Sequence, residues 1–186
     1  AYNLVLAFAC SILIIFDQLI AKLIYSNDFY IAWKYVPFLL ISAMFAALNA
    51  FLDSIFAANM DSKQVAKATI TGAIINAVLN IVLIHFIGTV GAAIATMVSY
   101  FCMWIIKHIK ISKVVELGSN MAKVFSTYAI LLAQAVIIFA VQNIWLKHIV
   151  AILLLAILIL MNIREIKIIA NKAKSVLKSK LSKSEG

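Results

Sequence analysis

Residues 72–100 read GAIINAVLNIVLIHFIGTVGAAIATMVSY, which predicts two apolar helices with almost no connection between them. The break is the run Gly88-Thr89-Val90-Gly91, which leaves room only for a tight turn. The first helix carries Asn76 and Asn80 on one face, because residues four apart share a helix face. The second helix has small residues at the same spacing, namely Gly91, Ala95 and Ser99. This pattern predicts an antiparallel helical hairpin with polar side chains near its centre.

The composition of the whole chain indicates an integral membrane protein. Of its 186 residues, 66% are hydrophobic and 12% are charged, whereas soluble proteins are about 45–50% apolar. Apolar runs close to 20 residues are long enough to cross a bilayer. Six such runs occur, at residues 4–24, 37–58, 67–87, 90–107, 123–142 and 146–163. The predicted fold class is therefore all-α integral membrane, with six transmembrane helices.

Several other classes of protein are not indicated. The sequence has no zinc-ligand spacing, phosphate-binding loop or nucleophile motif, so we expect neither an enzyme nor a resident cofactor or metal. The two cysteines, Cys10 and Cys102, lie inside apolar runs and are interpreted as buried thiols. The net charge of +9 sits beside the spans and in the C-terminal tail. Anionic lipids of the inner leaflet, rather than nucleic acid, are therefore the expected partner of these cations.

The basic residues predict the orientation of the chain. One side of the predicted membrane carries Lys63, Lys67, Lys107, Lys110, Lys113, Lys123, Arg164 and the tail lysines from Lys167 to Lys183. The other side carries only Lys34 and Lys147, with Lys22 inside the first span. Lysine and arginine favour cytoplasmic loops, so both ends of the chain are expected in the cytoplasm. Trp33, Tyr30, Tyr35 and Trp145 then belong to the outer interface.

Polar side chains inside the spans are the candidate functional residues. A charged residue at a helix centre costs roughly 2.5–3.5 kcal/mol on insertion scales, so each needs a physical reason. The candidates are Asp17 in the first span, Asn49 and Asp53 in the second, and Asn76 and Asn80 in the third. Either they bond between helices and hold the bundle together, or they line a hydrated cavity for polar cargo. Gln134, in the middle of the fifth span, is expected to bond between helices.

The C-terminal tail predicts a third kind of segment. From Arg164 to Leu181, apolar residues recur at steps of three and four, and the remaining positions are rich in lysine. This is the pattern of an amphipathic helix lying on the inner leaflet. The chain begins without Met and enters an apolar stretch at once, with no basic flank before it. We therefore expect a fragment whose upstream part is absent from this sequence.

The stretch from Tyr25 to Lys107 carries an ordered set of short motifs. They are Asp28-Phe29-Tyr30 in an outer loop, Pro37-Phe38-Leu39 at the next helix start, a lysine-rich turn, G-x-x-x-N-x-x-x-N at Gly72, Asn76 and Asn80, and G-x-x-G-A-A-x-A-T from Gly88 to Thr96. In order and spacing, this set resembles the polysaccharide, or lipid-linked oligosaccharide, flippases of the multidrug/oligosaccharidyl-lipid/polysaccharide exporter superfamily. The last two spans and the tail match such proteins in hydropathy alone.

The resemblance implies a fold and a function. Residues 1–107 would be the last four helices of the C-terminal lobe of a two-lobe exporter, like that of multidrug and toxin extrusion transporters. Residues 108–163 would add a loop and an extra helix pair, and residues 164–186 a basic cytoplasmic tail. The N-terminal lobe would be the missing partner. The cargo implied is undecaprenyl-diphosphate-linked oligosaccharide, flipped across the bacterial cytoplasmic membrane by alternating access. Coupling to a proton or sodium gradient is also implied.

Three alternatives stay open at this point. Two keep the fold and change the cargo, as a lipid II flippase or a multidrug exporter. The third is a stand-alone six-span channel or membrane-assembly subunit. The membrane-buried lysines and arginines that often contact a lipid diphosphate in such flippases are not evident in the sequence, because its cations fall in the predicted loops and near span ends. The cargo site therefore stays open as well.

Overall fold

The computed structural model of the chain describes residues 2–24, 27–112, 120–171 and 175, without the side chains of residues 24–30. This part of the chain is helical and contains no strand. All six of its long helices are long and apolar enough to cross a membrane. They are α1 (Tyr2–Ile24), α2 (Val36–Ala58), α3 (Ser62–Ile87), α4 (Thr89–Ile111), α5 (Met121–Ala140) and α6 (Ile144–Met161); the short 3-10 helix η1 (Asn27–Lys34) joins α1 to α2. The prediction of six membrane-spanning helices is confirmed.

The helices begin and end where local chemistry allows. Pro37 occupies the first turn of α2, where its missing N–H costs no hydrogen bond. The side chains of Asn120 and Asn143 accept hydrogen bonds from the first free backbone N–H groups of α5 and α6. At Gly88 the backbone takes a φ of 61°, a left-handed value that suits glycine, and the chain reverses there from α3 into α4. This reversal confirms the predicted hairpin.

Two helices extend beyond their predicted ends by more than two residues. The α3 helix begins at Ser62 rather than Lys67, and α4 continues to Ile111 rather than stopping at Lys107. Lysines ended the apolar runs in the sequence, but a helix continues through lysines whose side chains find water or a partner charge. Residues 108–111 therefore continue α4, so the predicted boundary after residue 107 falls inside a helix.

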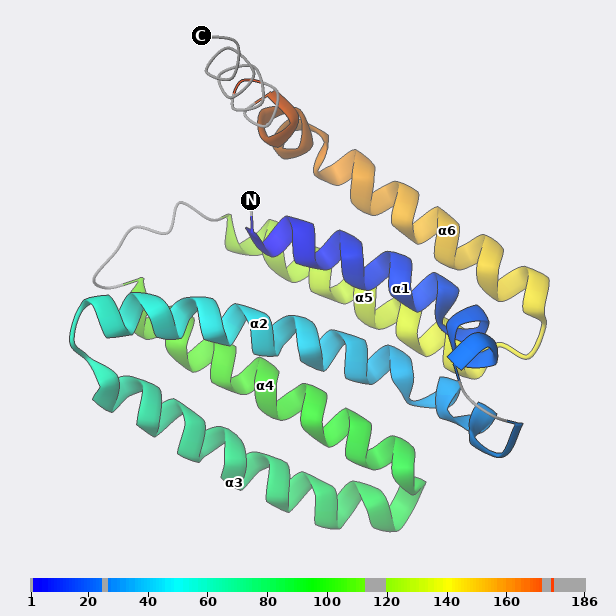
Figure 1. The fold of residues 1–186 in the computed structure, drawn as a ribbon, viewed down its shortest axis with the longest axis horizontal. Coiled ribbons are helices and arrows are strands. Elements are labelled where there is room, and N and C mark those ends of the chain that lie inside the picture. Colours follow the sequence, from blue (N-terminus) through cyan, green and yellow to red (C-terminus); the bar gives the residue numbers. More distant parts are fainter. Residues whose placement is uncertain (1, 25–26, 113–119, 172–174, 176–186) are drawn as a thin grey trace, which may run out of the picture.

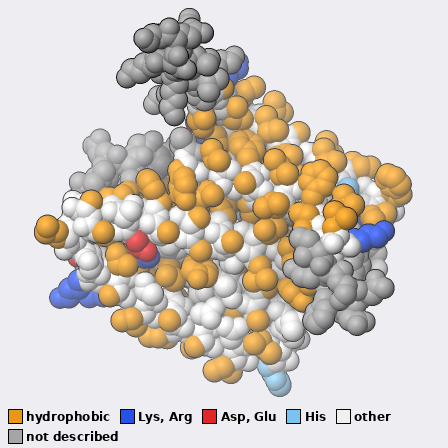
Figure 2. Space-filling model, viewed as in Figure 1, with side chains coloured by type: hydrophobic (Ala, Val, Ile, Leu, Met, Phe, Trp, Pro, Cys, Tyr) orange, Lys and Arg blue, Asp and Glu red, His pale blue; other side chains and the backbone are white. Residues whose placement is uncertain are grey.

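The bundle is ordered from α3 at one edge to α6 at the other (Figure 1). The α4 helix packs extensively against both α3 and α2, and α2 packs in turn against α1 and α5. The α5 and α6 helices pair with each other and against α1. Apolar side chains cover the visible surface, and charged groups gather near its ends (Figure 2). This distribution is the one expected for a bundle surrounded by lipid.

The buried core lies mainly between α1, α2, α4 and α5. It contains a cluster of buried rings from three helices, namely Phe45 from α2, Trp104 from α4 and Tyr128 from α5, and the less buried Phe101 and the exposed Phe125 pack at its edge. Aromatic pairs at centroid distances near 5–6 Å contribute beyond the area that they bury. The α3 helix, by contrast, buries only Ala68 and Gly72, so most of its surface faces outward.

The described part of the tail continues past α6. Residues 163–171 are helical, as predicted for the start of the amphipathic segment. Ile166 and Ile169 line an apolar groove of about 410 Å³ together with Leu4 and Phe8 of α1. The apolar face of this segment is thus turned toward the bundle. Lys113, the residues 172–174 and 176–186 of the predicted tail, and the side chains of Asp28-Phe29-Tyr30 lie outside the described residues.

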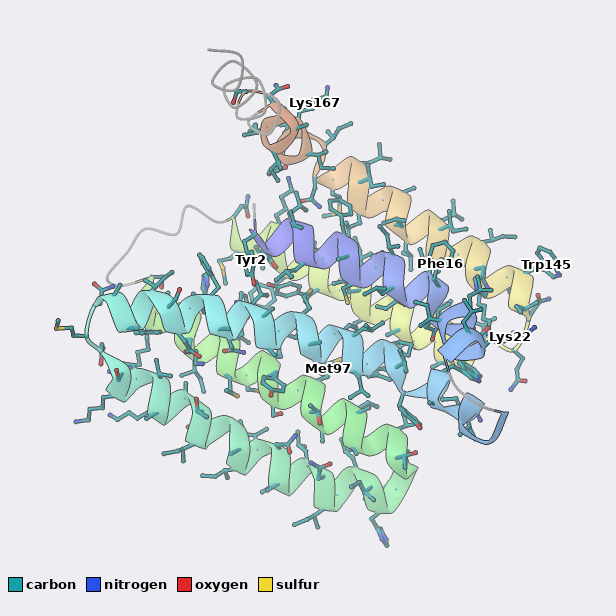
Figure 3. The ribbon with its side chains drawn as sticks, in the orientation of Figure 1. Tyr2, Phe16, Lys22, Met97, Trp145 and Lys167 are labelled. Atoms are coloured by element: carbon teal, nitrogen blue, oxygen red, sulfur yellow. The ribbon has the colours of Figure 1, made fainter. Side chains whose placement is uncertain are left out.

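The two ends of the bundle differ in their side chains. Lys22 and Trp145 lie at one end, and Tyr2 and Lys167 lie toward the other (Figure 3). Trp145 is exposed, as expected for an interfacial residue. The turns before α2 and after Gly88 share the end with Trp145, whereas the α2–α3 turn, with Lys63, lies at the end with Tyr2.

The close contact between α3 and α4 gives a matched pair of glycine substitutions. A Cβ at Gly91 would overlap the backbone carbonyl of Leu83, which cannot move without bending α3. A Cβ at Gly72 would instead overlap the flexible side chain of Met103. We predict that Gly91→Ala lowers the free energy of unfolding by about 1–3 kcal/mol, and that Gly72→Ala costs clearly less. Unfolding in detergent micelles measures both, and equal effects would contradict the packing described.

Candidate functional site

The polar residues predicted inside the membrane divide into three places in the fold. Asn49, Asn76 and Asn80 contact the middle of α4 or lie beside it. Asp53 lies one turn further along α2. Asp17 lies on α1 near the other end of the bundle.

Asn49 connects α2 to α4. Its side chain is 3% exposed, and its amide nitrogen donates to the carbonyl of Phe45, 2.9 Å away, and to the carbonyl of Tyr100 on α4, 3.0 Å away. A buried amide that finds two acceptors offsets the cost of leaving water. The amide oxygen Oδ1 is buried without a partner among the described residues, so the bond between helices accounts for the nitrogen of Asn49 and not for its oxygen.

Asn76 and Asn80 connect α3 to α4 in a short chain of hydrogen bonds. The Asn76 amide donates to the hydroxyl of Ser99, 3.2 Å away, and lies 3.5 Å from the hydroxyl of Thr96. Asn80 donates in turn to the side-chain and main-chain oxygens of Asn76, both 2.9 Å away. Asn76 also lines a pocket of about 270 Å³ between the two helices. Asn49 and Asn76 thus contact α4 at the same level, as predicted for their depth, but α4 lies between them.

Asp53 contacts a cation that the sequence pattern had placed in a loop. Lys107 of α4 is 1% exposed, and its Nζ lies 2.7 Å from an Asp53 carboxylate oxygen. Neither of these two atoms has a further hydrogen-bond partner among the described residues. Lys107 is therefore a buried lysine within a membrane-spanning helix, neutralised by Asp53. The expectation that Lys107 belongs to the cytoplasmic loop is wrong, because α4 continues for four residues beyond it.

A sequence signal for this burial did exist. Lys107 is followed four residues later by Ile111, which is 1% exposed and shares its helix face. An apolar residue one turn beyond a lysine indicates that the buried stripe continues past it. The sequence gives no similar signal that Asp53 is the partner of Lys107. The two residues are distant in sequence and come together only because α2 packs on α4.

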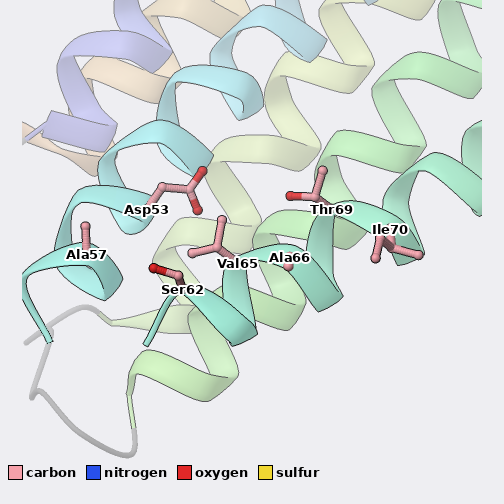
Figure 4. Close-up of a pocket in the computed structure, with 7 residues that line it drawn as sticks. All are labelled: Asp53, Ala57, Ser62, Val65, Ala66, Thr69 and Ile70. Atoms are coloured by element: carbon pink, nitrogen blue, oxygen red, sulfur yellow. The ribbon is translucent and has the colours of Figure 1, made fainter. Parts of the chain in front are cut away.

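The Asp53 side chain also faces a pocket. The pocket has a volume of about 390 Å³ and lies between the last turns of α2 and the first turns of α3 (Figure 4). Asp53, Ser62 and Thr69 contribute its polar groups, and Ala57, Val65, Ala66 and Ile70 complete the lining. The Asp53 side chain is 36% exposed, so it bridges the buried lysine and the open pocket. The arrangement offers an anionic surface backed by a hidden cation.

Asp17 is separate from this pocket. It lies toward the η1 end of α1 and is 1% exposed. Lys147, predicted to belong to the outer loops, is also buried, at 4% exposed, in the first turn of α6. Lys107 and Lys147, which the sequence pattern placed in loops, are thus both buried in the bundle.

Two further polar contacts hold the last two helices. Gln134, which is fully buried on α5, accepts a hydrogen bond from Ser11 of α1 and donates to the carbonyl of Ala151 of α6. It bonds between helices, as predicted. At the surface, Lys123 Nζ lies 2.6 Å from both carboxylate oxygens of Glu165, and these hydrogen bonds lower the pKa of Glu165. The second contact fixes the start of the tail segment against α5.

The described residues contain no group of three or more His, Cys, Asp or Glu side chains placed to hold a metal ion. The fold and its buried charges define the chain as a multi-pass α-helical membrane protein. Comparison with models of known protein families, with curated proteins and with solved structures finds no match. Any narrower assignment must therefore come from the residues themselves.

The unequal exposure of Asp53 and Lys107 predicts unequal effects of their removal. Asp53→Asn leaves a buried ammonium without a counterion, and we expect a loss of about 3 kcal/mol in the free energy of unfolding. Lys107→Met leaves a carboxylate that reaches water through the pocket, so its loss should be smaller. Ser54→Ala, on an exposed face of the same helix, is the control. Thermal unfolding in detergent measures all three, and a larger loss for Lys107→Met would contradict the described burial.

Proposed function

We propose that this chain is the C-terminal part of a polysaccharide-type flippase, which moves undecaprenyl-diphosphate-linked oligosaccharide across the bacterial cytoplasmic membrane by alternating access. In this proposal α1 to α4 belong to the second lobe of a two-lobe exporter, and α5 and α6 are an added helix pair. Both ends of the chain lie in the cytoplasm, in keeping with the distribution of lysine and arginine.

One observation carries the proposal, namely the Lys107–Asp53 pair beneath a pocket at the end of the bundle that carries Lys63. With the orientation proposed, this pocket opens toward the cytoplasmic leaflet, where lipid-linked sugars are made. Charged groups buried in membrane helices are expensive and commonly mark transport pathways. Lys107 also supplies the membrane-buried cation that was not evident in the sequence.

The pair suggests how an anionic headgroup is handled. A diphosphate that reaches the pocket competes with the Asp53 carboxylate for the Lys107 ammonium, since both are anions that bind the same donor. Loading of cargo then breaks the contact between α2 and α4, and its release restores that contact. An ion pair exchanged in this way links headgroup binding to the packing of two helices, which alternating access requires.

The alternative cargoes differ in the surfaces that they need. A cationic drug would favour a carboxylate facing aromatic walls, but the Asp53 pocket is lined by small and aliphatic residues. The aromatic-lined cavity, about 470 Å³ between α2, α4 and α5, does not include Asp53. The pocket therefore lacks the aromatic walls that a cationic drug would need, and an anionic headgroup would bind there only by displacing Asp53 from Lys107. A lipid II flippase would share this headgroup chemistry.

The test measures export by the complete gene product carrying Asp53→Asn and Lys107→Met together. Removing both charges leaves no unpaired ion, so the protein should stay abundant. We predict that lipid-linked oligosaccharide accumulates and that surface polysaccharide falls about tenfold, the effect of losing roughly 1.4 kcal/mol of binding. Asp61→Asn with Lys63→Met makes the same charge changes in the α2–α3 turn and is the matched control.

Two outcomes would count against the proposal in different ways. Normal export by an abundant double variant would remove the pair from the transport pathway and return it to a structural role. Normal surface polysaccharide in cells that lack the gene would overturn the flippase proposal itself. The second result would favour the channel or assembly-subunit alternative.

A further inference from the structure

A second buried carboxylate lies at the end of the bundle away from the Asp53 pocket. Asp17 of α1 is 1% exposed, and neither of its carboxylate oxygens has a hydrogen-bond partner among the described residues. A carboxylate ion in this setting has lost its water without gaining a side-chain donor, and the backbone N–H of Gln18 is the group besides Lys147 that favours its charge. The effective cost of burying one ion unpaired is several kcal/mol.

The cation that acts on Asp17 does not contact it directly. Lys147, in the first turn of α6, attracts Asp17 electrostatically, yet the two do not form a direct ion pair. The Lys147 ammonium lies instead 4.8 Å from the ring centroid of Trp33 in η1. A lysine over the face of an indole gains a cation–π attraction, and most when it is desolvated. The Lys147 ammonium is thus placed over the ring of Trp33 and not in a direct ion pair with Asp17.

Other ionisable groups near Asp17 do not fill this role. The α1 helix packs against α2, α5, α6 and η1. Asp53 on α2 and Lys123 on α5 lie toward the opposite end of the bundle. Lys22 on α1 is exposed, and Lys34 ends η1. His148, next to Lys147, bonds to the carbonyl of Ile144. Lys147 is the charged side chain that acts on Asp17 in the described part of the chain.

We propose that Asp17 is a proton-binding site at the junction of α1 and α6, where a proton and the Lys147 ammonium compete for one carboxylate. In the proton-bound state of this proposal, one Asp17 carboxyl oxygen carries a proton taken from water as an O–H bond, and Lys147 rests on Trp33 as it does in the structure. When the proton returns to water, the ionised carboxylate draws Lys147 off the ring. The proton thereby controls how α6 docks against α1 and η1, whatever cargo the protein carries.

The direction in which Lys147 changes proton binding by Asp17 follows from its charge. A nearby cation favours the ionised form of a carboxyl group. Removing the cation with Lys147→Met should therefore let Asp17 keep its proton to a higher pH. Releasing the cation from the ring with Trp33→Leu should have the opposite effect, because Lys147 is then free to approach Asp17.

Infrared spectroscopy of the purified chain in lipid nanodiscs tests the site, because a protonated carboxyl group has a C=O stretching band distinct from that of a carboxylate. We expect a band near neutral pH that Asp17→Asn abolishes. In Lys147→Met the band should persist to a pH about one unit higher than in the parent chain, which is a tenfold change in proton binding. In Trp33→Leu the band should disappear at a lower pH than in the parent chain. Lys22→Met, on the exposed part of α1, should leave it unchanged.

Two results would overturn the proposal. One is a spectrum that Asp17→Asn does not alter, which would mean that Asp17 is ionised in the bundle. The other is a band whose pH dependence is the same in Lys147→Met as in the parent chain. The tryptophan fluorescence that Trp33→Leu removes reports whether Lys147 leaves the ring of Trp33 as pH rises, and circular dichroism confirms that each variant is folded.

Discussion

The ion pair between Asp53 and Lys107 is the contact on which the arrangement of α2 and α4 depends. Burying an ammonium group in an apolar bundle without a counterion is costly, and Asp53 supplies that counterion for Lys107 across the helix interface. The requirement fixes the relative register of the two helices, because a shift of one turn would separate the charges by about 5 Å. The exposed face of Asp53 then faces the pocket between α2 and α3.

Other helix contacts in the bundle also contain buried polar groups that find partners on a neighbouring helix. Asn49 and Asp53 contact α4 from α2, and Asn76 contacts α4 from α3. Gly91 allows α3 to approach α4 closely, so that the short side chain of Asn76 reaches its partner on α4. On the other side, Gln134 connects α5 to α1 and α6. The α2–α4, α3–α4, α1–α5 and α5–α6 interfaces thus each contain a polar contact surrounded by apolar packing, which specifies neighbours as dispersion alone cannot.

The sequence predicted the helices well and the charge pairs poorly, for physical reasons. Apolar runs near 20 residues and a glycine at Gly88 determine spans and a turn through local rules. Helix ends were less accurate, since Lys107 looked like the start of a loop. The pairing of Asp53 with Lys107, and the approach of Lys147 to Asp17, depend on which helices pack together. That information lies in the packing of distant segments, and not in the pattern of any one of them.

A double-mutant cycle on Asp53 and Lys107 tests the central claim most directly. The free energy of unfolding would be measured for the parent chain, Asp53→Asn, Lys107→Met and the double variant, in one detergent at low salt. The buried ion pair predicts that the double variant loses less stability than the sum of the single losses, by more than about 1 kcal/mol. Losses that add to within about 0.5 kcal/mol would contradict it, and would mean that the two side chains do not interact in the folded protein.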